Sequence, residues 1–198
     1  MDKLSIGITG SIGMGKTTVS NFLKELGYPV WIADDCIESL YKFNNEGFKI
    51  FKKYYPDVIV KRKVDKEKII YYLKKDENLN KLIKDKIYPL LEEKRKNFFE
   101  IKESFLTFFE IPLLFENNLQ KNFDFIICVK VPEFIQEKRV LTRKNMNMEN
   151  LNFFKNKQLP IKIISKNSNF LVLTNASKIN VQKQIKRICN KISRYHNE

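Results

Sequence analysis

Residues 10–17 read Gly10-Ser11-Ile12-Gly13-Met14-Gly15-Lys16-Thr17, which completes the pattern G-x-x-x-x-G-K-[ST]. A polyphosphate is bound by backbone N–H groups that line a concave turn, and glycine allows the chain to turn that tightly. Lys16 then supplies positive charge for the β- and γ-phosphates, and the Thr17 hydroxyl can ligate Mg²⁺. The stretch therefore predicts a phosphate-binding loop.

The residues on either side of this loop support the same interpretation. Leu4 to Thr9 form an apolar run typical of a short buried strand, and Val19, Phe22 and Leu23 repeat at helical spacing after the loop. A strand, a glycine loop and a helix in this order are what the motif requires, which disfavours a glycine-rich turn that binds nothing. We expect the phosphates to contact the loop at these residues: Ser11, Ile12, Gly13, Met14, Gly15, Lys16, Thr17 and Thr18.

Length and composition limit the class of protein. The 198 residues, 43% of them hydrophobic, suit one domain with a packed core and an insertion. No apolar run approaches the roughly 20 residues that a membrane helix needs, and the first strand starts near Met1, so we expect a cytoplasmic protein with no membrane partner. The net charge of +14 is compatible with a polyanion partner. Because lysine accompanies abundant Asn, Ile, Tyr and Phe, as an AT-rich coding sequence would give, we expect no nucleic-acid partner.

Cysteine and histidine usage excludes several kinds of site. Cys36, Cys128 and Cys189 are odd in number and far apart, which matches neither a disulfide framework nor a metal-ligand spacing, so we interpret them as small apolar residues. The single histidine, His196, is the third residue from the end of the sequence. A histidine base, a Ser-His-Asp triad and a histidine metal cluster are therefore disfavoured.

The order of apolar runs predicts an α/β fold. Strands are expected at 4–9, 30–33, 105–109, 125–129 and 170–174, with helical periodicity between them. Alternation of strands and helices indicates a parallel five-stranded sheet with right-handed crossovers and helices on both faces. The prediction is a single P-loop NTPase three-layer sandwich, with its core at 1–34, 105–131 and 168–198 and a helical insertion at 35–104.

Charged residues occur at two further informative places. Asp34 and Asp35 directly follow the strand expected at 30–33, and ligands of parallel sheets lie at the carboxyl ends of strands. The alternative is that an aspartate caps the next helix, which suits Asp35 better than Asp34. Arg139 and Arg143 lie four residues apart on one face of a helix that begins near Pro132, and a solvated basic face is the alternative to a ligand contact.

Several blocks together resemble the dephospho-CoA kinase family. They are Gly7 to Thr18, Leu26-Gly27-Tyr28-Pro29-Val30 with Ala33-Asp34, Tyr88-Pro89-Leu90 and Ile111-Pro112-Leu113-Leu114-Phe115-Glu116. The blocks keep the family's order and spacing over most of the chain. Pro-Leu-Leu-Phe-Glu after a hydrophobic strand is the most distinctive, since generic P-loop proteins lack it.

The resemblance implies transfer of the ATP γ-phosphoryl group to the ribose 3′-hydroxyl of dephospho-CoA, the last step of coenzyme A synthesis. ATP and Mg²⁺ are the implied cofactors, dephospho-CoA is the small-molecule partner, and a monomer is expected. The helical insertion at 35–104 is the implied acceptor-binding part. Asp34 matches the family aspartate that contacts the acceptor hydroxyl and takes its proton. Phosphoryl transfer depends mostly on positioning and charge stabilisation, which these residue types can supply.

The resemblance also assigns residues around the triphosphate. Residues 132–167, with Gln136, Arg139 and Arg143, resemble a lid that closes over it, with Lys16 and Arg143 acting in catalysis. Thr17 is the implied metal ligand and Asn175 the implied contact on the base side. Glu110 and Glu116 flank the exit of the third strand, where they can hold Mg²⁺ through water, although Glu116 can equally be structural.

The chain departs from the family pattern at a few positions. Ile32 replaces the first of two aspartates that often flank the alanine, and Tyr88 stands where histidine usually precedes proline. Lys66 takes an often-arginine position, and Ser168-Asn169 replace an Ala-Asp pair, which weakens any inference about adenine contacts there. None of these changes touches the loop or Asp34.

Two rival functions share the loop. Another small-molecule kinase, acting on nucleoside monophosphates or shikimate-like alcohols, predicts the same loop but offers no reason for the Pro-Leu-Leu-Phe-Glu segment. A nucleotide switch or nucleic-acid-bound ATPase would suit the net charge of +14. However, the sequence has no N-K-x-D guanine-reading motif, and Asp34 would have no evident role in such a protein.

Overall fold

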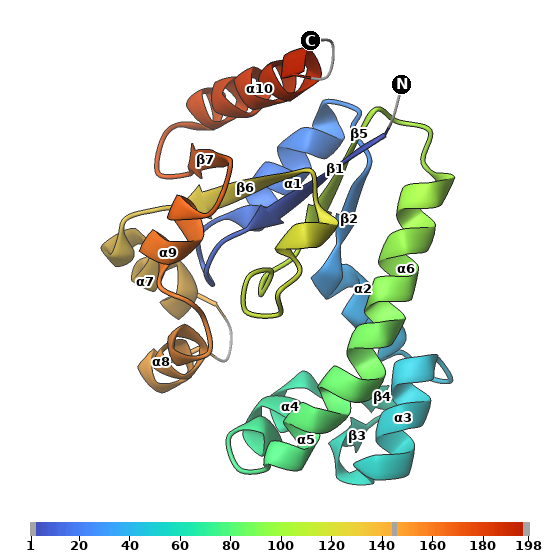
Figure 1. Cartoon of the computed structure of the whole chain (residues 1–198). Coiled ribbons are helices and arrows are strands. Elements are labelled where there is room, and N and C mark those ends of the chain that lie inside the picture. The colour runs from blue at the N-terminus through green and yellow to red at the C-terminus, as the bar shows by residue number, and fades with distance from the viewer. Residues whose placement is uncertain (1–2, 144–145, 196–198) are drawn as a thin grey trace. The chain divides into compact units, whose positions relative to one another are not determined.

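The computed structural model describes residues 3–143 and 146–195, so His196 lies outside the described residues. The chain divides into two compact units, one of residues 1–31 and 102–198 and one of residues 32–101. In Figure 1 the second unit is the stretch of ribbon coloured from mid-blue through cyan to light green.

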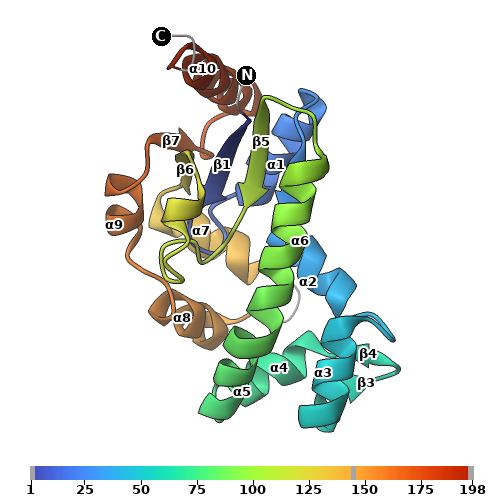
Figure 2. The same cartoon turned by 45° about the vertical axis from the view of Figure 1, so that its right-hand side comes forward.

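The first unit is built on a five-stranded sheet. Its strands lie in the order β2 (Val30–Ile32), β5 (Leu106–Glu110), β1 (Leu4–Thr9), β6 (Phe125–Lys130) and β7 (Phe170–Leu173). Figure 2 shows β5, β1, β6 and β7 in this order. Strand β1 pairs in parallel with both β5 and β6, and β6 pairs in parallel with β7. The predicted α/β fold with a parallel five-stranded sheet is confirmed.

Strand β1 is the centre of this sheet and leads directly into the glycine loop. All six of its residues are buried, as expected for a parallel strand that is covered on both faces. Its register sets Ile8 opposite Glu110 on β5 and Thr9 opposite Cys128 on β6. The carboxyl ends of three neighbouring strands therefore meet where the loop starts at Gly10.

Helices cover this sheet. Helix α1 (Lys16–Glu25) contacts β1 and β5, α10 (Lys178–Tyr195) packs on α1 and β7, and α9 (Ile161–Lys166) packs on β6. Helix α10 buries Val181, Ile185, Ile188 and Ile192, the positions that its helical spacing predicted. Helices α7 (Glu133–Leu141) and α8 (Met148–Asn156) follow β6 and contact each other.

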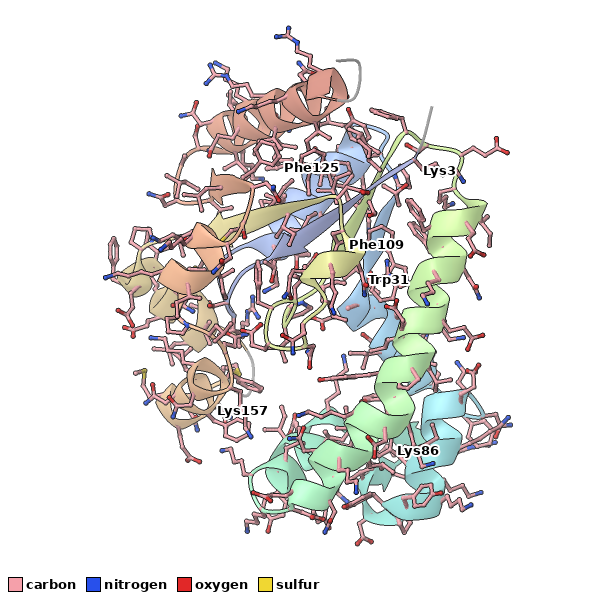
Figure 3. The ribbon with its side chains drawn as sticks, in the orientation of Figure 1. Lys3, Trp31, Lys86, Phe109, Phe125 and Lys157 are labelled. Atoms are coloured by element: carbon pink, nitrogen blue, oxygen red, sulfur yellow. The ribbon has the colours of Figure 1, made fainter. Side chains whose placement is uncertain are left out.

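Aromatic pairs tie neighbouring strands of the sheet to each other. The rings of Trp31 on β2 and Phe109 on β5 lie 6.3 Å apart between centroids, and those of Phe125 on β6 and Phe170 on β7 lie 5.9 Å apart. Figure 3 labels three of these residues and shows Trp31 and Phe109 next to each other. Such pairs stabilise adjacent strands beyond the area that they bury.

The second unit is mainly helical. It contains α2 (Ala33–Leu40), α3 (Glu46–Tyr54), α4 (Lys66–Leu73), α5 (Glu77–Leu82) and α6 (Tyr88–Ile101), with a 3-10 turn at Pro56–Val58. Its own core is a cluster of buried side chains: Leu40, Tyr41, Phe48, Phe51, Val58, Val64, Ile69, Leu79, Ile83 and Ile87. Asp65 and Asp76 cap α4 and α5 by accepting backbone N–H groups of the first turn.

One feature of this unit differs from the expected helical insertion. Strands β3 (Ile59–Val60) and β4 (Lys63–Val64) form an antiparallel hairpin, whose turn residues Lys61 and Arg62 have φ of 46° and 61°. Glycine and asparagine normally occupy such a turn, so the sequence carried no turn signal. A π-helical turn at Ile83–Ile87 also precedes Pro89, which has no N–H to give to a regular helix.

Candidate active site

The glycine loop is held in a conformation that only glycine adopts easily. Gly10, Gly13 and Gly15 have φ of 148°, 76° and 91°. A Cβ added to Gly13 would lie 2.5 Å from Val140 Cγ2 on α7, and one added to Gly15 would lie 2.7 Å from Thr174 Oγ1. The glycines are therefore required both by the backbone turn and by the close approach of neighbouring elements.

Donor groups gather at the start of α1. The first backbone N–H groups of a helix have no carbonyl partner within the helix, and they carry partial positive charge. Helix α1 begins at Lys16, with Gly15 as its N-cap in a left-handed conformation. The Lys16 ammonium donates to Gly10 O at 2.7 Å and to Ser11 O at 3.2 Å, so it lies across the loop. This arrangement suits a polyphosphate.

A buried carboxylate lies beside the loop threonine. Glu110, at the end of β5, is 2% exposed, and its Oε2 accepts a hydrogen bond of 2.7 Å from Ser20 Oγ. Its Oε1 accepts one of 3.3 Å from Thr17 Oγ1. Hydroxyl and carboxylate oxygens are the ligands that Mg²⁺ prefers, so this pair fits a magnesium ion. Among the described residues, no cluster of three or more His, Cys, Asp or Glu side chains forms a metal site.

Thr174 is a neighbour of the loop that sequence reasoning missed. Its hydroxyl donates to Met14 O at 2.7 Å and accepts from Arg139 Nη1 at 3.1 Å. Arg139 also donates through Nη2 to Thr174 O at 2.8 Å. The guanidinium is therefore fixed beside Gly15. Thr174 directly follows β7, at the edge of the sheet where ligands are expected, and that position was the available signal.

Glu116, the last residue of the Pro-Leu-Leu-Phe-Glu segment, has a structural contact. Its Oε1 accepts the backbone N–H of Leu159 at 2.8 Å, while its Oε2 is buried without a hydrogen-bond partner in the part of the chain that the structure describes. The neighbouring Gln158 accepts the N–H of Ile12, and Gln136 donates to Ile12 O. Residues of the 132–167 segment thus contact the loop through side-chain amides, and Gln158 was not predicted.

The remaining predicted residues lie on exposed positions. Arg143 follows α7 and Asn175 lies in the turn after β7, and both are exposed. Asp34 belongs to the second unit, where it is an exposed residue in the first turn of α2. The N-cap of α2 is Ile32, and no side chain caps it, so the interpretation of Asp35 as a cap is wrong. Both aspartates still interact favourably with the positive end of the helix.

The cysteines behave as apolar side chains. Cys128 on β6 is fully buried, and burial raises the pKa of its thiol to about 11, against a smaller opposing effect of the Lys130 and Lys16 charges. Burial likewise raises the pKa of Cys189 to about 11. Both thiols are therefore protonated at neutral pH. In addition, the stretches 3–143 and 146–195 contain no helix long and apolar enough to cross a membrane.

A family model and two relatives match most of this chain. The family model described as dephospho-CoA kinase matches residues 4–190. The dephospho-CoA kinase of Bartonella quintana is 33% identical over 183 residues, which is 91% of this chain and 93% of that protein. The enzyme of the same name from Nitrobacter winogradskyi is 33% identical over 188 residues, covering 93% and 94%.

A solved structure shares the fold. The crystal structure of TT1252 from Thermus thermophilus superposes with a TM-score of 0.83 at 23% identity, covering 96% of this chain and 98% of that one. The fold likeness extends over nearly the whole chain.

Proposed function

Because the chain belongs to the dephospho-CoA kinase family, we propose that it transfers the γ-phosphoryl group of ATP to the ribose 3′-hydroxyl of dephospho-CoA. Coenzyme A and ADP are the products, and this is the final step of coenzyme A biosynthesis. The observation that carries the proposal is the glycine loop with Lys16, Thr17 and the buried Glu110, in a chain matched by the family model from residue 4 to 190.

In this proposal the loop binds the triphosphate. The amides of Gly13 and Gly15 and the N-terminus of α1 contact the β- and γ-phosphates, and Lys16 exchanges its carbonyl contacts for phosphate oxygens. Thr17 Oγ1 and the Glu110 carboxylate, which lie 3.3 Å apart, would hold Mg²⁺, the threonine directly and the glutamate through water. Bound there, the ion would offset negative charge on the phosphate oxygens. Arg139, already fixed at Thr174, and the exposed Arg143 contribute further charge from the 132–167 segment, which acts as a lid.

Asp34 is proposed as the acceptor-side base. The bond from the ribose 3′-oxygen to the γ-phosphorus forms as the bond from that phosphorus to the β,γ-bridging oxygen breaks, and ADP leaves. The 3′-hydroxyl proton passes to the Asp34 carboxylate. The exposed position of Asp34 and its place two residues after the end of strand β2, where the family motif has its aspartate, support this role.

The test is direct. Purified protein is incubated with ATP, Mg²⁺ and dephospho-CoA, and the product is weighed by mass spectrometry. We expect one added phosphoryl group, and we expect Asp34→Asn to lower kcat strongly while ATP binding survives. Asp35→Asn, one position along the same exposed turn, is the matched control and should keep most of the activity. An Asp34→Asn enzyme with unchanged kcat would remove Asp34 from the mechanism.

Assays with other possible acceptors decide between this function and its rivals. Turnover of a nucleoside monophosphate or of shikimate, with none of dephospho-CoA, would overturn the proposed acceptor. ATP turnover that requires duplex DNA would instead favour a nucleic-acid-bound ATPase, whose binding would weaken steeply with salt. We further propose that the protein acts as a monomer in the cytoplasm, which sedimentation and fractionation would test.

A further inference from the structure

Two glutamines hold the two polar groups of one loop residue. The N–H of Ile12 donates to Gln158 Oε1 at 3.1 Å, and the carbonyl of Ile12 accepts from Gln136 Nε2 at 2.8 Å. Gln136 lies on α7 and is only 3% exposed, while Gln158 lies shortly after α8 and is half-buried. We call this set of three residues the glutamine clasp.

The glutamine clasp fixes two successive peptide groups. In the peptide between Ser11 and Ile12, the N–H donates to Gln158 Oε1. The carbonyl of the same peptide, Ser11 O, accepts from Lys16 Nζ at 3.2 Å and from Met14 N at 3.3 Å. Gln136 holds the next peptide, between Ile12 and Gly13, by its carbonyl. Both polar groups of the first peptide are therefore hydrogen-bonded. In the second peptide the clasp holds the carbonyl and leaves the N–H of Gly13 to other contacts.

The orientation of the Gly13 amide follows from this. A peptide group is planar, and in the trans form its C=O and N–H point in opposite directions. The described residues contain no cis peptide bond. Because Gln136 pulls the Ile12 carbonyl toward α7, the N–H of Gly13 points away from α7. A hydrogen bond to the carbonyl also polarises the peptide and makes that N–H a stronger donor.

The clasp itself is anchored. A Cβ on Gly13 would lie 3.1 Å from Gln136 O, so α7 packs directly on the loop backbone. Lys155 on α8 bonds Glu133 at 2.7 Å and Glu137 at 3.0 Å, which ties α8 to α7. Leu159, next to Gln158, is held by Glu116. Lys157, the residue before Gln158, is labelled in Figure 3 beside α8.

We propose that Gln136 is a positioning residue that aims the Gly13 amide at the triphosphate, and that Gln158 holds the neighbouring peptide so that this aim is kept. The proposal rests on the proposed function only in that the loop binds phosphate. It requires no assumption about the acceptor. Inorganic pyrophosphate can therefore test it without dephospho-CoA.

The experiment uses the full chain labelled with [¹⁵N]glycine. The chain has six glycines, so its amide spectrum is simple, and Gly27 and Gly47 lie outside the loop and serve as references. Gln136→Met keeps the length of the side chain and loses the donor. We expect about fivefold to tenfold weaker binding of pyrophosphate, and a smaller movement of the Gly13 signal on titration, because one oriented hydrogen bond is lost. The KM for ATP should rise by a similar factor, with a smaller change in kcat.

A matched variant separates positioning from general destabilisation. Gln184 on α10 also bonds both polar groups of one residue, since Leu173 N donates to its Oε1 at 3.0 Å and its Nε2 donates to Leu173 O at 3.2 Å. Gln184→Met loses both of these bonds at a more exposed position and should leave pyrophosphate binding unchanged. Equal weakening in both variants would overturn the proposal.

The half-buried Gln158 provides a second variant should Gln136→Met not fold. Gln158→Met is expected to weaken pyrophosphate binding by a few fold. Unchanged pyrophosphate affinity with an unchanged Gly13 signal in the folded variant would overturn the proposal. If pyrophosphate binds as expected but dephospho-CoA is not phosphorylated, the acceptor is wrong and the glutamine clasp stands.

Discussion

Two buried threonines of the first unit predict opposite effects of the same substitution. Thr174 is 4% exposed and Thr107 is fully buried on β5. The Thr174 hydroxyl donates to Met14 O at 2.7 Å and accepts from Arg139 Nη1 at 3.1 Å. The Thr107 hydroxyl has no hydrogen-bond partner within the described ranges. Replacement by valine keeps the shape of each side chain and removes only the hydroxyl's hydrogen-bonding groups.

The expected magnitudes follow from the hydrogen bonds. Thr174→Val loses two bonds, one of them to a charged donor, and leaves the buried Met14 carbonyl without that partner, which costs about 2–3 kcal/mol of unfolding free energy. Thr107→Val removes a buried hydroxyl that makes no bond, so it should be neutral or stabilising by roughly 1 kcal/mol. For a chain of this size, Tm should fall by about 4–10 °C in the first variant and should not fall in the second.

Urea and thermal unfolding of the wild type and both variants, followed by circular dichroism, would measure this difference. Thr174→Ser keeps the hydroxyl and should recover most of the lost stability, which separates the hydrogen bonds from the packing of the methyl group. Equal losses for Thr174→Val and Thr107→Val would refute the reasoning, because they would show that the two hydroxyls contribute alike despite their different surroundings.

Three further expectations concern the loop and a buried thiol. Gly15→Ala and Gly27→Ala both place alanine at a φ near +90°, which costs about 1–2 kcal/mol of stability. Only at Gly15 does the new Cβ meet Thr174. Steady-state kinetics should therefore show a raised KM for ATP in Gly15→Ala alone. Lys16→Ala should lower kcat by at least about a hundredfold with little change in Tm, since it removes charge aimed at the transferred group, and a variant that retains most of its kcat would contradict that role. Burial raises the pKa of the Cys128 thiol from an ordinary 9.0 to about 11 in the folded chain, so the thiol's contribution to the free energy of unfolding is complete below pH 9 and is lost as pH rises from 9 to 11. Urea titrations across this range should therefore show a shallower loss of stability in Cys128→Ala than in the wild type.

The sheet and the loop could be predicted because their signals are local. Each strand of the five-stranded sheet is a short apolar run, and the glycine loop is a contiguous pattern, so neither depends on distant residues. Strand β1 was expected at Leu4 to Thr9 and is found there, since a fully buried parallel strand is apolar on both faces. The hairpin β3–β4 could not be found in this way, because Lys61 and Arg62 adopt a left-handed turn that their side chains do not favour.

The supports of the loop were missed for a different reason. Thr174 and Gln158 contact residues that lie 160 and 146 positions away in the chain. Threonine and glutamine are common surface residues, and nothing in their immediate sequence indicates a backbone partner. What could be expected is that polar residues at the carboxyl ends of parallel strands lie beside the glycine loop, and Glu110 and Thr174 both contact loop residues. Gln158 follows a helix and carries no comparable signal.

Most of the residues that depart from the family pattern lie in the second unit, so we expect them to affect the kinetics of one substrate more than the other. Ile32, Lys66 and Tyr88 all belong to the second unit, where Lys66 pairs with Glu38 at 3.7 Å and Tyr88 packs against the unit's core. The loop, its glutamine clasp and Glu110 belong to the first unit and match what phosphate binding requires.

We propose that the second unit, like the acceptor-binding insertion expected at 35–104, carries the acceptor site. Its changed residues Ile32, Lys66 and Tyr88 should therefore affect the KM for dephospho-CoA and leave the KM for ATP unaffected. Lys66→Arg restores the usual family residue at an exposed position. The surface ion pair of Lys66 with Glu38 contributes little to stability, so a change in the KM for dephospho-CoA in this variant would not come from a loss of stability. A variant that changes the KM for ATP alone would contradict this assignment, because it would show that the departure acts on the nucleotide side.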